Sequence, residues 1–319
     1  MFPITLKQEI EKLLQGQKVS SLADDYARLS LRYRGEKVGS ASLLKTEKEA
    51  LSYAAVRMPA TYGAVFASLE KVLEVTDLAP KTMLDVGAGT GACGWAANEL
   101  IALEKLTCLE REKVMRSLGQ QLMQTAEESV LRQAQWVDFD LLKDDKLPSA
   151  ELVTASYVLN EMGAASVAVA EKLWQATEQI LVIIEPGTPR DFSALSVIRE
   201  HLIKQGAYVV APCPHQQKCP LSEKNWCHFS ARIERSRLHK QLKGADMGYE
   251  DEKYCFMAFS RFEPKINYQR ILNIPQVQKM EISAQVCTTQ GQCENFTVSI
   301  KDKSAYKQAK KWRWGDILA

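Results

Sequence analysis

The chain has 319 residues, of which 46% are hydrophobic and 25% are charged, values typical of a soluble globular protein. Its length suits two domains, or one domain with appendages. A formal net charge of only +2 excludes a uniformly basic chain, so any nucleic-acid-binding surface must come from local clusters of charge.

No apolar run approaches the length of a membrane span, so we expect no membrane contact. The N-terminus mixes acidic and basic residues. It has neither the apolar core of a signal peptide nor the acid-poor character of an organelle presequence. We therefore expect a cytoplasmic protein, and a monomer.

Eight cysteines in such a chain predict thiol or metal chemistry rather than disulfides. We expect Cys93 and Cys108, in the region of alternating strands and helices, to be small buried residues. The other six cysteines all lie in the last third of the chain.

Residues 1–78 read as a helical region. Apolar residues recur at helical spacing between Leu6 and Leu14. The pattern roughly continues at Leu22, Tyr26, Leu29 and Leu31. A third helix is predicted over 46–56. Pro59 suits the first turn of a fourth, which should run to about Val75. This region could cover a ligand crevice, present a substrate surface, or be purely structural.

A nine-residue stretch, 84–92, is the strongest motif. A short apolar run leads to Asp85, then to glycines at 87, 89 and 91, and a helical stretch follows over 94–103. This order predicts a strand, a tight turn and a helix. Glycines let the backbone approach a ligand closely, and the helix N-terminus directs unpaired N–H groups into the same crevice.

Two classes of ligand use such a turn. The spacing Gly87-x-Gly89-x-x-Ala92 fits the dinucleotide fingerprint, which is weak alone. Asp85 favours the cationic methionine end of S-adenosylmethionine (SAM), because a carboxylate repels a pyrophosphate. The pattern resembles motif I of class I methyltransferases. The predicted SAM-binding residues of the turn are Asp85, Gly87, Ala88, Gly89 and Gly91. The alternative is a tight turn that binds no ligand.

Residues 79–264 are predicted to form a Rossmann-like α/β domain. Strands and helices alternate from Lys81 to about Val210, which implies a parallel sheet with helices on both faces. The expected strands are 82–86, 105–109, 134–138, 151–156 and 179–184. Ligands bind at the carboxyl ends of such strands. After the second strand, Glu110 is placed to accept the ribose hydroxyls of SAM. After the third, Asp138 or, preferably, Asp140 is placed to accept the adenine amino group.

The loops after the fourth and fifth strands should hold the methionine end of SAM and the methyl acceptor. Ser156 is a predicted SAM-binding residue. Asn160, Glu161 and Glu185 are candidates for catalysis by position alone. No acceptor motif of exocyclic-amine methylation follows the fourth strand.

The loop 211–230 contains Cys213, Cys219 and Cys227 with prolines between them, and no regular element is expected there. Such a segment gains order from a cross-link, and thiolates hold zinc or an iron–sulfur cluster, usually with a fourth ligand. His215 and His228 favour zinc, whereas widely spaced cysteines are compatible with a cluster. Three free thiols are the alternative, and a nucleophilic role for Cys213 is a weaker one.

Residues 265–319 should form a small β-rich appendage, with strands over 281–286 and 296–300, after a strand over 254–259 that completes the main sheet. Two basic stretches occur, at 232–243 and 301–313. The second interleaves six bases with Tyr306 and Trp312, followed by Trp314. It predicts phosphate contact and base stacking, with a solvated basic face as the alternative.

Several motifs together resemble the small-ribosomal-subunit methyltransferase-like family, which includes bacterial relatives of a mitochondrial methyltransferase-like protein. The likeness runs from about residue 50 to the C-terminus. It rests on 57–62 (RMPATY), 85–91, 185–187 (EPG), 211–215 (APCPH), 219–220 (CP), 226–227 (WC), 249–253 (YEDEK) and 314–316 (WGD).

The resemblance implies a class I methyltransferase fold that carries a four-iron, four-sulfur (4Fe-4S) cluster and acts in maturation of the small ribosomal subunit, near its rRNA. Three family ligands match Cys213, Cys219 and Cys227. The fourth maps to Cys287 in the appendage, with Cys293 and Cys255 in reserve. The cluster would then pin the appendage to the methyltransferase domain, with zinc as the alternative metal. The alternative function is a non-catalytic assembly factor that binds SAM.

Overall fold

The computed structural model describes residues 2–35, 46–144, 146–222 and 224–318. For residues 29–35 only the backbone is described, so the side chains of the predicted apolar positions Leu29 and Leu31 lie outside the description. No helix in the described ranges is long and apolar enough to cross a membrane. The domain boundaries at 78/79 and 264/265 stay a prediction.

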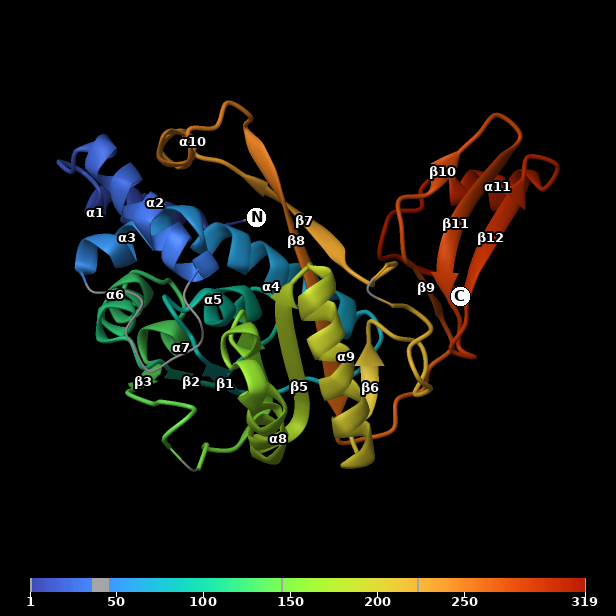
Figure 1. Ribbon diagram of the computed structural model, residues 1–319, viewed down its shortest axis with the longest axis horizontal. Helices are drawn as coiled ribbons and strands as arrows, with labels where there is room; N and C mark the ends of the chain where they lie inside the picture. Colours follow the sequence, from blue (N-terminus) through green and yellow to red (C-terminus); the bar gives the residue numbers. More distant parts are fainter. Residues whose placement is uncertain (1, 36–45, 145, 223, 319) are drawn as a thin grey trace.

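The larger sheet has eight strands in the order β3-β2-β1-β4-β5-β8-β6, with β7 paired to β8 (Figure 1). These are β1 (Thr82–Val86), β2 (Lys105–Leu109), β3 (Gln135–Val137), β4 (Ala150–Ser156), β5 (Thr177–Pro186), β6 (Tyr208–Ala211), β7 (Phe229–Glu234) and β8 (Tyr249–Ser260). The five predicted strands are present and pair in parallel.

The parallel pairing predicted for the strands between 81 and 210 is confirmed, and the sheet is completed by β8, which runs antiparallel to β5, β6 and β7. The cause is the connection before it. β7 and β8 form a hairpin, and strands joined in this way must run in opposite directions. The second half of β8 is continuously buried between β5 and β6. The sheet is therefore mixed.

Eleven α-helices are described: α1 (Ile4–Leu13), α2 (Val19–Gly35), α3 (Glu47–Val56), α4 (Met58–Leu73), α5 (Ala92–Asn98), α6 (Lys113–Met123), α7 (Ser129–Arg132), α8 (Ser166–Ala176), α9 (Pro189–Lys204), α10 (Arg237–Lys243) and α11 (Lys303–Ala309). The four predicted N-terminal helices are present. α5 starts earlier and ends sooner than the predicted stretch 94–103. Two 3-10 turns, Leu159–Glu161 and Gly163–Ala165, follow β4.

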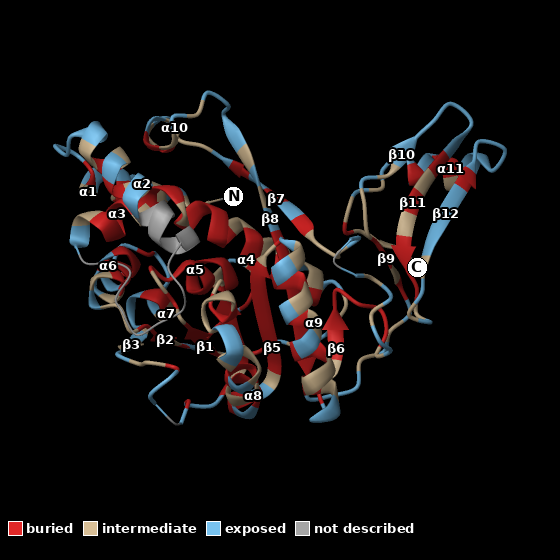
Figure 2. Cartoon of the chain, in the orientation of Figure 1, coloured by how far each residue is buried: buried red, intermediate tan, exposed pale blue. Residues whose placement is uncertain are grey.

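The core occupies both faces of the sheet, as β5 illustrates (Figure 2). Alternate side chains of a strand point to opposite faces. Ile180, Val182 and Ile184 pack into the cluster that contains α4 and α5, whereas Leu181 and Ile183 pack into the cluster that contains α8 and α9. The apolar run of β5 is thus what a strand buried on both sides requires.

Local signals set the ends of the helices above the site. Thr46 caps α3, since its hydroxyl accepts the Glu49 N–H while the Glu49 carboxylate accepts the Thr46 N–H. Pro59 lies in the first turn of α4, where its missing N–H costs nothing. α4 then packs on α5 and against β7 and β8, which places the N-terminal helices beside the carboxyl ends of the strands.

The hairpin of β7 and β8, with α10 between them, was not predicted. Figure 1 shows it projecting beyond the sheet, and α10 packs back on α2 and α3. A smaller sheet has the order β10-β11-β9-β13, with β12 paired to β11. Its strands are β9 (Gln269–Ile271), β10 (Gln276–Val277), β11 (Glu281–Cys287), β12 (Cys293–Ser299) and β13 (Ile317–Leu318). The β-rich segment predicted at the C-terminus is therefore present, with α11 packed on β11 and β12.

Candidate functional site

The turn after β1 has the backbone that the glycine pattern predicts. Gly87, Gly89 and Gly91 have φ angles of 69°, 58° and 88°. A Cβ atom on Gly87 would lie 2.5 Å from Cγ2 of Val158. Only glycine combines this left-handed backbone with such close packing. The turn delivers the chain into the N-terminus of α5.

An open crevice with about 780 Å³ of empty space lies above this turn, at the carboxyl ends of β1, β2 and β4. Its lining includes six residues that the sequence selected: Gly87, Gly89, Glu110, Asp140, Ser156 and Glu161. Its mixture of polar and apolar side chains suits a small organic ligand. The structure therefore joins residues from four separate segments in one concave site.

Glu110 braces the glycine turn from the end of β2. Its Oε2 accepts the Gly89 N–H at 2.8 Å and its Oε1 accepts the Glu112 N–H at 2.7 Å. Burial raises the pKa of Glu110, and these two hydrogen bonds oppose that shift. Each oxygen keeps acceptor capacity for a further donor in the crevice.

Asp85 lies beneath the crevice rather than in its lining. It is 1% exposed, and its Oδ1 accepts the Thr154 hydroxyl at 2.9 Å. Burial raises the pKa of Asp85 to about 7, against the lowering effect of that hydrogen bond. Ala88 and Gly91 are also absent from the lining, and Ala88 belongs instead to the hydrophobic core.

Of the three catalytic candidates, only one lines the crevice. Glu161 lines the crevice, and burial raises its pKa to about 7. Glu185, 3% exposed, does not line it and instead accepts the N–H groups of Leu159 and Asn160 at 2.9 and 3.1 Å. Burial raises the pKa of Glu185 to about 8. Glu185 and Asn160 thus belong to the support of the turn that carries Glu161.

Of the two acids after β3, Asp140 lines the crevice, whereas exposed Asp138 pairs with Arg116 outside it. Sequence reasoning missed a set of large side chains in the lining: Tyr53, Met115, Phe139, Tyr157 and Met162. They come from distant segments, so no local spacing relates them. The motif at 57–62 hinted at a role for this part of the N-terminal helices.

Five cysteines line a second, mainly apolar cavity between α9, β8 and the cysteine-rich loop: Cys213, Cys219, Cys227, Cys255 and Cys287. All eight cysteines are free, and Cys293 does not line the cavity. Burial and the neighbouring Cys213 raise the pKa of Cys219 to about 11, and burial raises the pKa of Cys227 and Cys287 as well.

In the part of the chain that the structure describes, no three His, Cys, Asp or Glu side chains are placed to hold a single metal ion. The two histidines that favoured zinc do not line the cavity. His215 is buried, and His228 stacks on Trp226 with the ring centroids 4.8 Å apart. The site therefore has the thiols for a metal group but not the geometry of a mononuclear zinc centre.

The basic tail, residues 301–313, exposes its charged side chains but packs its aromatic rings against other parts of the protein. All six bases between 301 and 313 are exposed. Tyr306 is buried, whereas Trp312 and Trp314 are half-buried and pack on Phe296 and His228, respectively. Base stacking by Trp312 and Trp314 stays a prediction, because both rings remain partly exposed.

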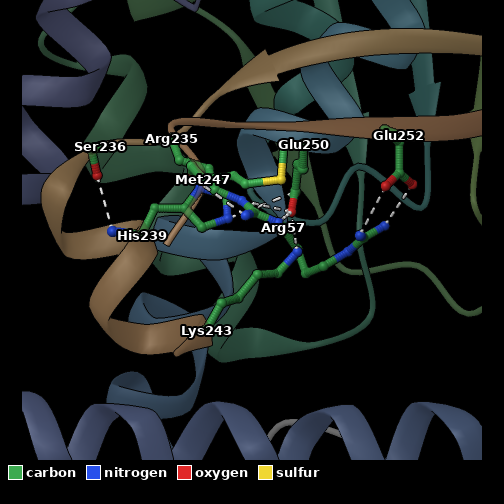
Figure 3. A network of polar contacts seen from close by, with 8 residues as sticks. All are labelled: Arg57, Arg235, Ser236, His239, Lys243, Met247, Glu250 and Glu252. Atoms are coloured by element: carbon green, nitrogen blue, oxygen red, sulfur yellow. Dashed lines mark hydrogen bonds and ion pairs between the residues drawn. The ribbon is translucent and has the colours of Figure 1, made fainter. Parts of the chain in front are cut away.

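The basic stretch 232–243 is largely neutralised within the hairpin. Arg235 and Lys243 both pair with Glu250, and Arg232 pairs with Asp251 (Figure 3 shows the Glu250 group). These cations are held by carboxylates of the adjoining strand. Local charge in this stretch therefore serves to fold the hairpin more than to present a basic surface.

The strand order, the glycine turn and the acid that ends β2 define a Rossmann-like fold of the class I SAM-dependent methyltransferases. The chain belongs to the family described as "Mitochondrial small ribosomal subunit Rsm22", whose model matches residues 47–319. Family membership expected from the motifs is thereby confirmed.

Two curated relatives illustrate the family. The human ribosome assembly protein METTL17, mitochondrial, is 24% identical over 292 residues, which cover 86% of this chain and 63% of that protein. The Rsm22-cox11 tandem protein 2, mitochondrial, of Schizosaccharomyces pombe is 21% identical over 368 residues, covering 98% and 48%. The chain thus spans between about half and just under two-thirds of the length of these relatives.

Solved structures with a similar fold include a putative RNA methyltransferase from Pyrococcus horikoshii, 13% identical, covering 74% of this chain and 96% of that one with a TM-score of 0.42. Magnesium protoporphyrin IX methyltransferase from Synechocystis with bound SAM is 12% identical, covering 78% and 99%, also with a TM-score of 0.42.

Proposed function

We propose that this protein binds SAM in the crevice above the glycine turn and acts in assembly of the small ribosomal subunit, on or near its rRNA. The observation that carries the proposal is the single crevice that joins Gly89, Glu110 and Ser156. Family membership and the description of the human relative as a ribosome assembly protein support the subunit as the partner.

The chemistry of the crevice fits SAM. Gly89 leaves room for a ligand, because an added Cβ there would meet only Cε of Met115, at 3.5 Å. The Ser156 hydroxyl is buried and lacks a hydrogen-bond partner among the described residues. Glu110 would accept the ribose hydroxyls, and Asp140 the adenine amino group. Bound SAM supplies an electrophilic methyl group and a positive charge that the acids of this site would stabilise.

Methyl transfer is the finer proposal, and Glu161 is its best candidate. This carboxyl lines the crevice with a pKa of about 7, so it would exchange a proton with an acceptor near neutral pH. The competing function is a non-catalytic assembly factor that uses SAM as a structural or sensing ligand. It is favoured by the position of Glu185 and Asn160, which do not line the crevice.

Calorimetry with SAM tests the first step, with Glu110→Ala as the variant that should lose binding and Glu104→Ala, an exposed acid just before β2, as the matched control. Mass spectrometry of rRNA from a deletion strain then tests methylation. One missing methyl group, restored by wild type but not by Glu161→Gln, supports the enzyme. Tight SAM binding with an unchanged modification map supports the non-catalytic factor.

For the cysteine cavity we propose a 4Fe-4S cluster on Cys213, Cys219, Cys227 and Cys287. In such a cluster each thiolate binds a different iron, so four sulfurs need not converge on one point as they must around zinc. Four free thiols around one apolar cavity support this assignment. The cluster would bind the four thiolates and so join the loop 211–230 to β11, which is a structural task. Cys255, which also lines the cavity, is the reserve ligand.

Anaerobic purification with iron and sulfide analysis tests the cluster. Cys287→Ser should remove the visible absorption and expose residues 265–319 to proteolysis. Cys293→Ser is the matched control, because Cys293 is the β-ladder partner of Cys287 and does not line the cavity. A colourless protein with one zinc per chain would contradict the proposal, and a brown Cys287→Ser variant would transfer the fourth ligand to Cys255.

The exposed bases of the tail are the proposed contact with rRNA phosphates. The cytoplasmic location and the monomeric state stay predictions. Cell fractionation and light scattering of the purified protein test them.

A further inference from the structure

Two sequence motifs without a role in the crevice meet in the folded chain. Arg57 lies at the junction of α3 and α4, and Glu252 lies in β8, 195 residues away (Figure 3). Nη1 and Nη2 of Arg57 donate to Oε2 and Oε1 of Glu252 at 3.2 and 3.0 Å. A bidentate pair of this kind holds both side chains in one orientation.

Tyr157 is the third member of this group. Its hydroxyl donates to Oε1 of Glu252 at 2.9 Å, and the guanidinium carbon of Arg57 lies 5.8 Å from the centre of its ring. Tyr157 also lines the crevice. Glu252 thus accepts three hydrogen bonds and links the hairpin, the N-terminal helices and the loop after β4.

The backbone of Tyr157 explains why such a tether is useful. Its φ angle is 59°, the one positive value at a non-glycine residue within the described ranges. A bulky side chain disfavours this conformation, which persists only where surrounding contacts hold it. The turn it makes brings Val158 against Gly87, where a Cβ atom would come within 2.5 Å of Val158. The conformation of Tyr157 therefore sets how the loop after β4 meets the glycine turn.

The alternation of side chains along β8 places its successive acids on opposite faces of the strand. Glu250 and Glu252 face the body of the protein, and Glu250 accepts hydrogen bonds from Arg235 and Lys243 near the tip of the hairpin. Asp251, between them, faces outward and pairs with Arg232. The bonds of Glu250 thus stay within the hairpin, whereas Glu252 bonds the hairpin to Arg57 of the N-terminal helices and to Tyr157, which lines the crevice.

We propose that Glu252 and Arg57 are positioning residues that hold Tyr157 as a wall of the crevice, so that cofactor affinity depends on how the hairpin of β7 and β8 is seated. This inference rests on the proposed binding of SAM and assigns its regulation to a surface outside the crevice. Any macromolecule that displaces the hairpin would weaken SAM binding through Tyr157, without touching the cofactor.

The test is a double-mutant cycle in SAM affinity, measured by calorimetry on the full chain. Tyr157→Phe keeps the ring and removes only the hydroxyl, and Glu252→Gln weakens the whole tether. We expect each to weaken binding about tenfold, the factor that corresponds to one lost hydrogen bond of typical strength. The double variant should lose little more, since the two residues act as one unit. Asp251→Asn, one residue away, should bind within about twofold of wild type.

Hydrogen exchange of the amides in 156–161, measured without SAM, gives a second readout. Both single variants should exchange faster there, while Asp251→Asn matches wild type. If wild type binds SAM and Tyr157→Phe shows unchanged SAM affinity and unchanged exchange, this inference is overturned while the proposed function stands. A wild type that does not bind SAM overturns the proposed function. Faster exchange in the variants would then still support the positioning of Tyr157. If Glu252→Gln fails to fold, Tyr157→Phe decides.

Discussion

The indole Nε1 of Trp226 donates a hydrogen bond to the carbonyl oxygen of Gly187 at 3.0 Å. Gly187 is buried, and a Cβ atom there would lie 2.7 Å from the Tyr254 amide nitrogen. Trp226 precedes Cys227 of the cysteine cavity, and Glu185, two residues before Gly187, holds the turn beside the crevice. The cysteine cavity and the crevice therefore share the end of β5.

Trp226→Phe should destabilise the protein by about 1 kcal/mol, because it leaves the buried Gly187 carbonyl without its donor. Urea unfolding measures this loss. Under the proposed function, the variant should also lose its cluster faster in air than wild type. Trp312→Phe, in the smaller sheet, is the matched control for the cluster. Equal rates of loss in the two variants would contradict the link to Trp226.

Asp85 should make the protein less stable as pH rises. Its pKa of about 7 lies above the value of about 3.9 for an unfolded chain. Between these values the native state binds more protons than the unfolded state, so the free energy of unfolding falls with rising pH. Relative to Asp85→Asn, wild type should lose on the order of 4 kcal/mol from pH 4 to pH 8.

Chemical denaturation of both proteins across this range measures the difference, in which contributions from the other acids cancel. Asp138→Asn is the control, since this side chain is exposed. A constant difference between Asp85→Asn and wild type from pH 4 to pH 8 would show that Asp85 is charged throughout.

Reversing the charge of Lys310, Lys311 and Arg313 should weaken binding to the small subunit. If all three contact phosphates, the negative slope of the logarithm of affinity against the logarithm of salt concentration should become shallower by about three. Filter binding at several salt concentrations measures both quantities. Tyr306 should not contribute by stacking, since its ring is buried.

The control for the tail is reversal of Lys12, Lys81 and Lys143, which changes the net charge equally on other surfaces. An equal loss of affinity in this control would assign the effect to net charge. Full affinity in the tail variant would show that the bases of the tail are solvated and do not contact rRNA phosphates.

Arg270 should be among the most sensitive positions for stability. Its side chain is 0% exposed and donates to the carbonyls of Pro212 and Gly315 and to the carboxylate of Glu74. Arg270→Leu removes these hydrogen bonds, leaves the Pro212 carbonyl without the Arg270 donor and should cost about 3 kcal/mol. We expect faster proteolysis within 265–319, measured by mass spectrometry. Exposed Arg313→Leu should be close to neutral, and equal effects would contradict the assigned role.

Local chemistry was enough to predict the glycine turn, the five parallel strands and the four N-terminal helices. A left-handed turn needs Gly87, Gly89 and Gly91 wherever the rest of the chain goes, and the apolar run of β5 identifies a doubly buried strand. The spacing of Asp140 and Glu161 from their strands also led to two residues that line the crevice. These features depend on neighbours within a few residues.

Contacts between distant segments decided the rest. β8 lies antiparallel between β5 and β6 because the hairpin with β7 reverses the chain, a pairing that no local pattern encodes. Glu185 was a candidate for catalysis by sequence but turns to backbone N–H groups in the fold. The bond between Arg57 and Glu252 spans 195 residues, and the conformation of Tyr157 depends on it. The sequence by itself determined the glycine turn, the parallel strands and the N-terminal helices, whereas packing between remote segments determined the hairpin of β7 and β8 and which residues face the crevice.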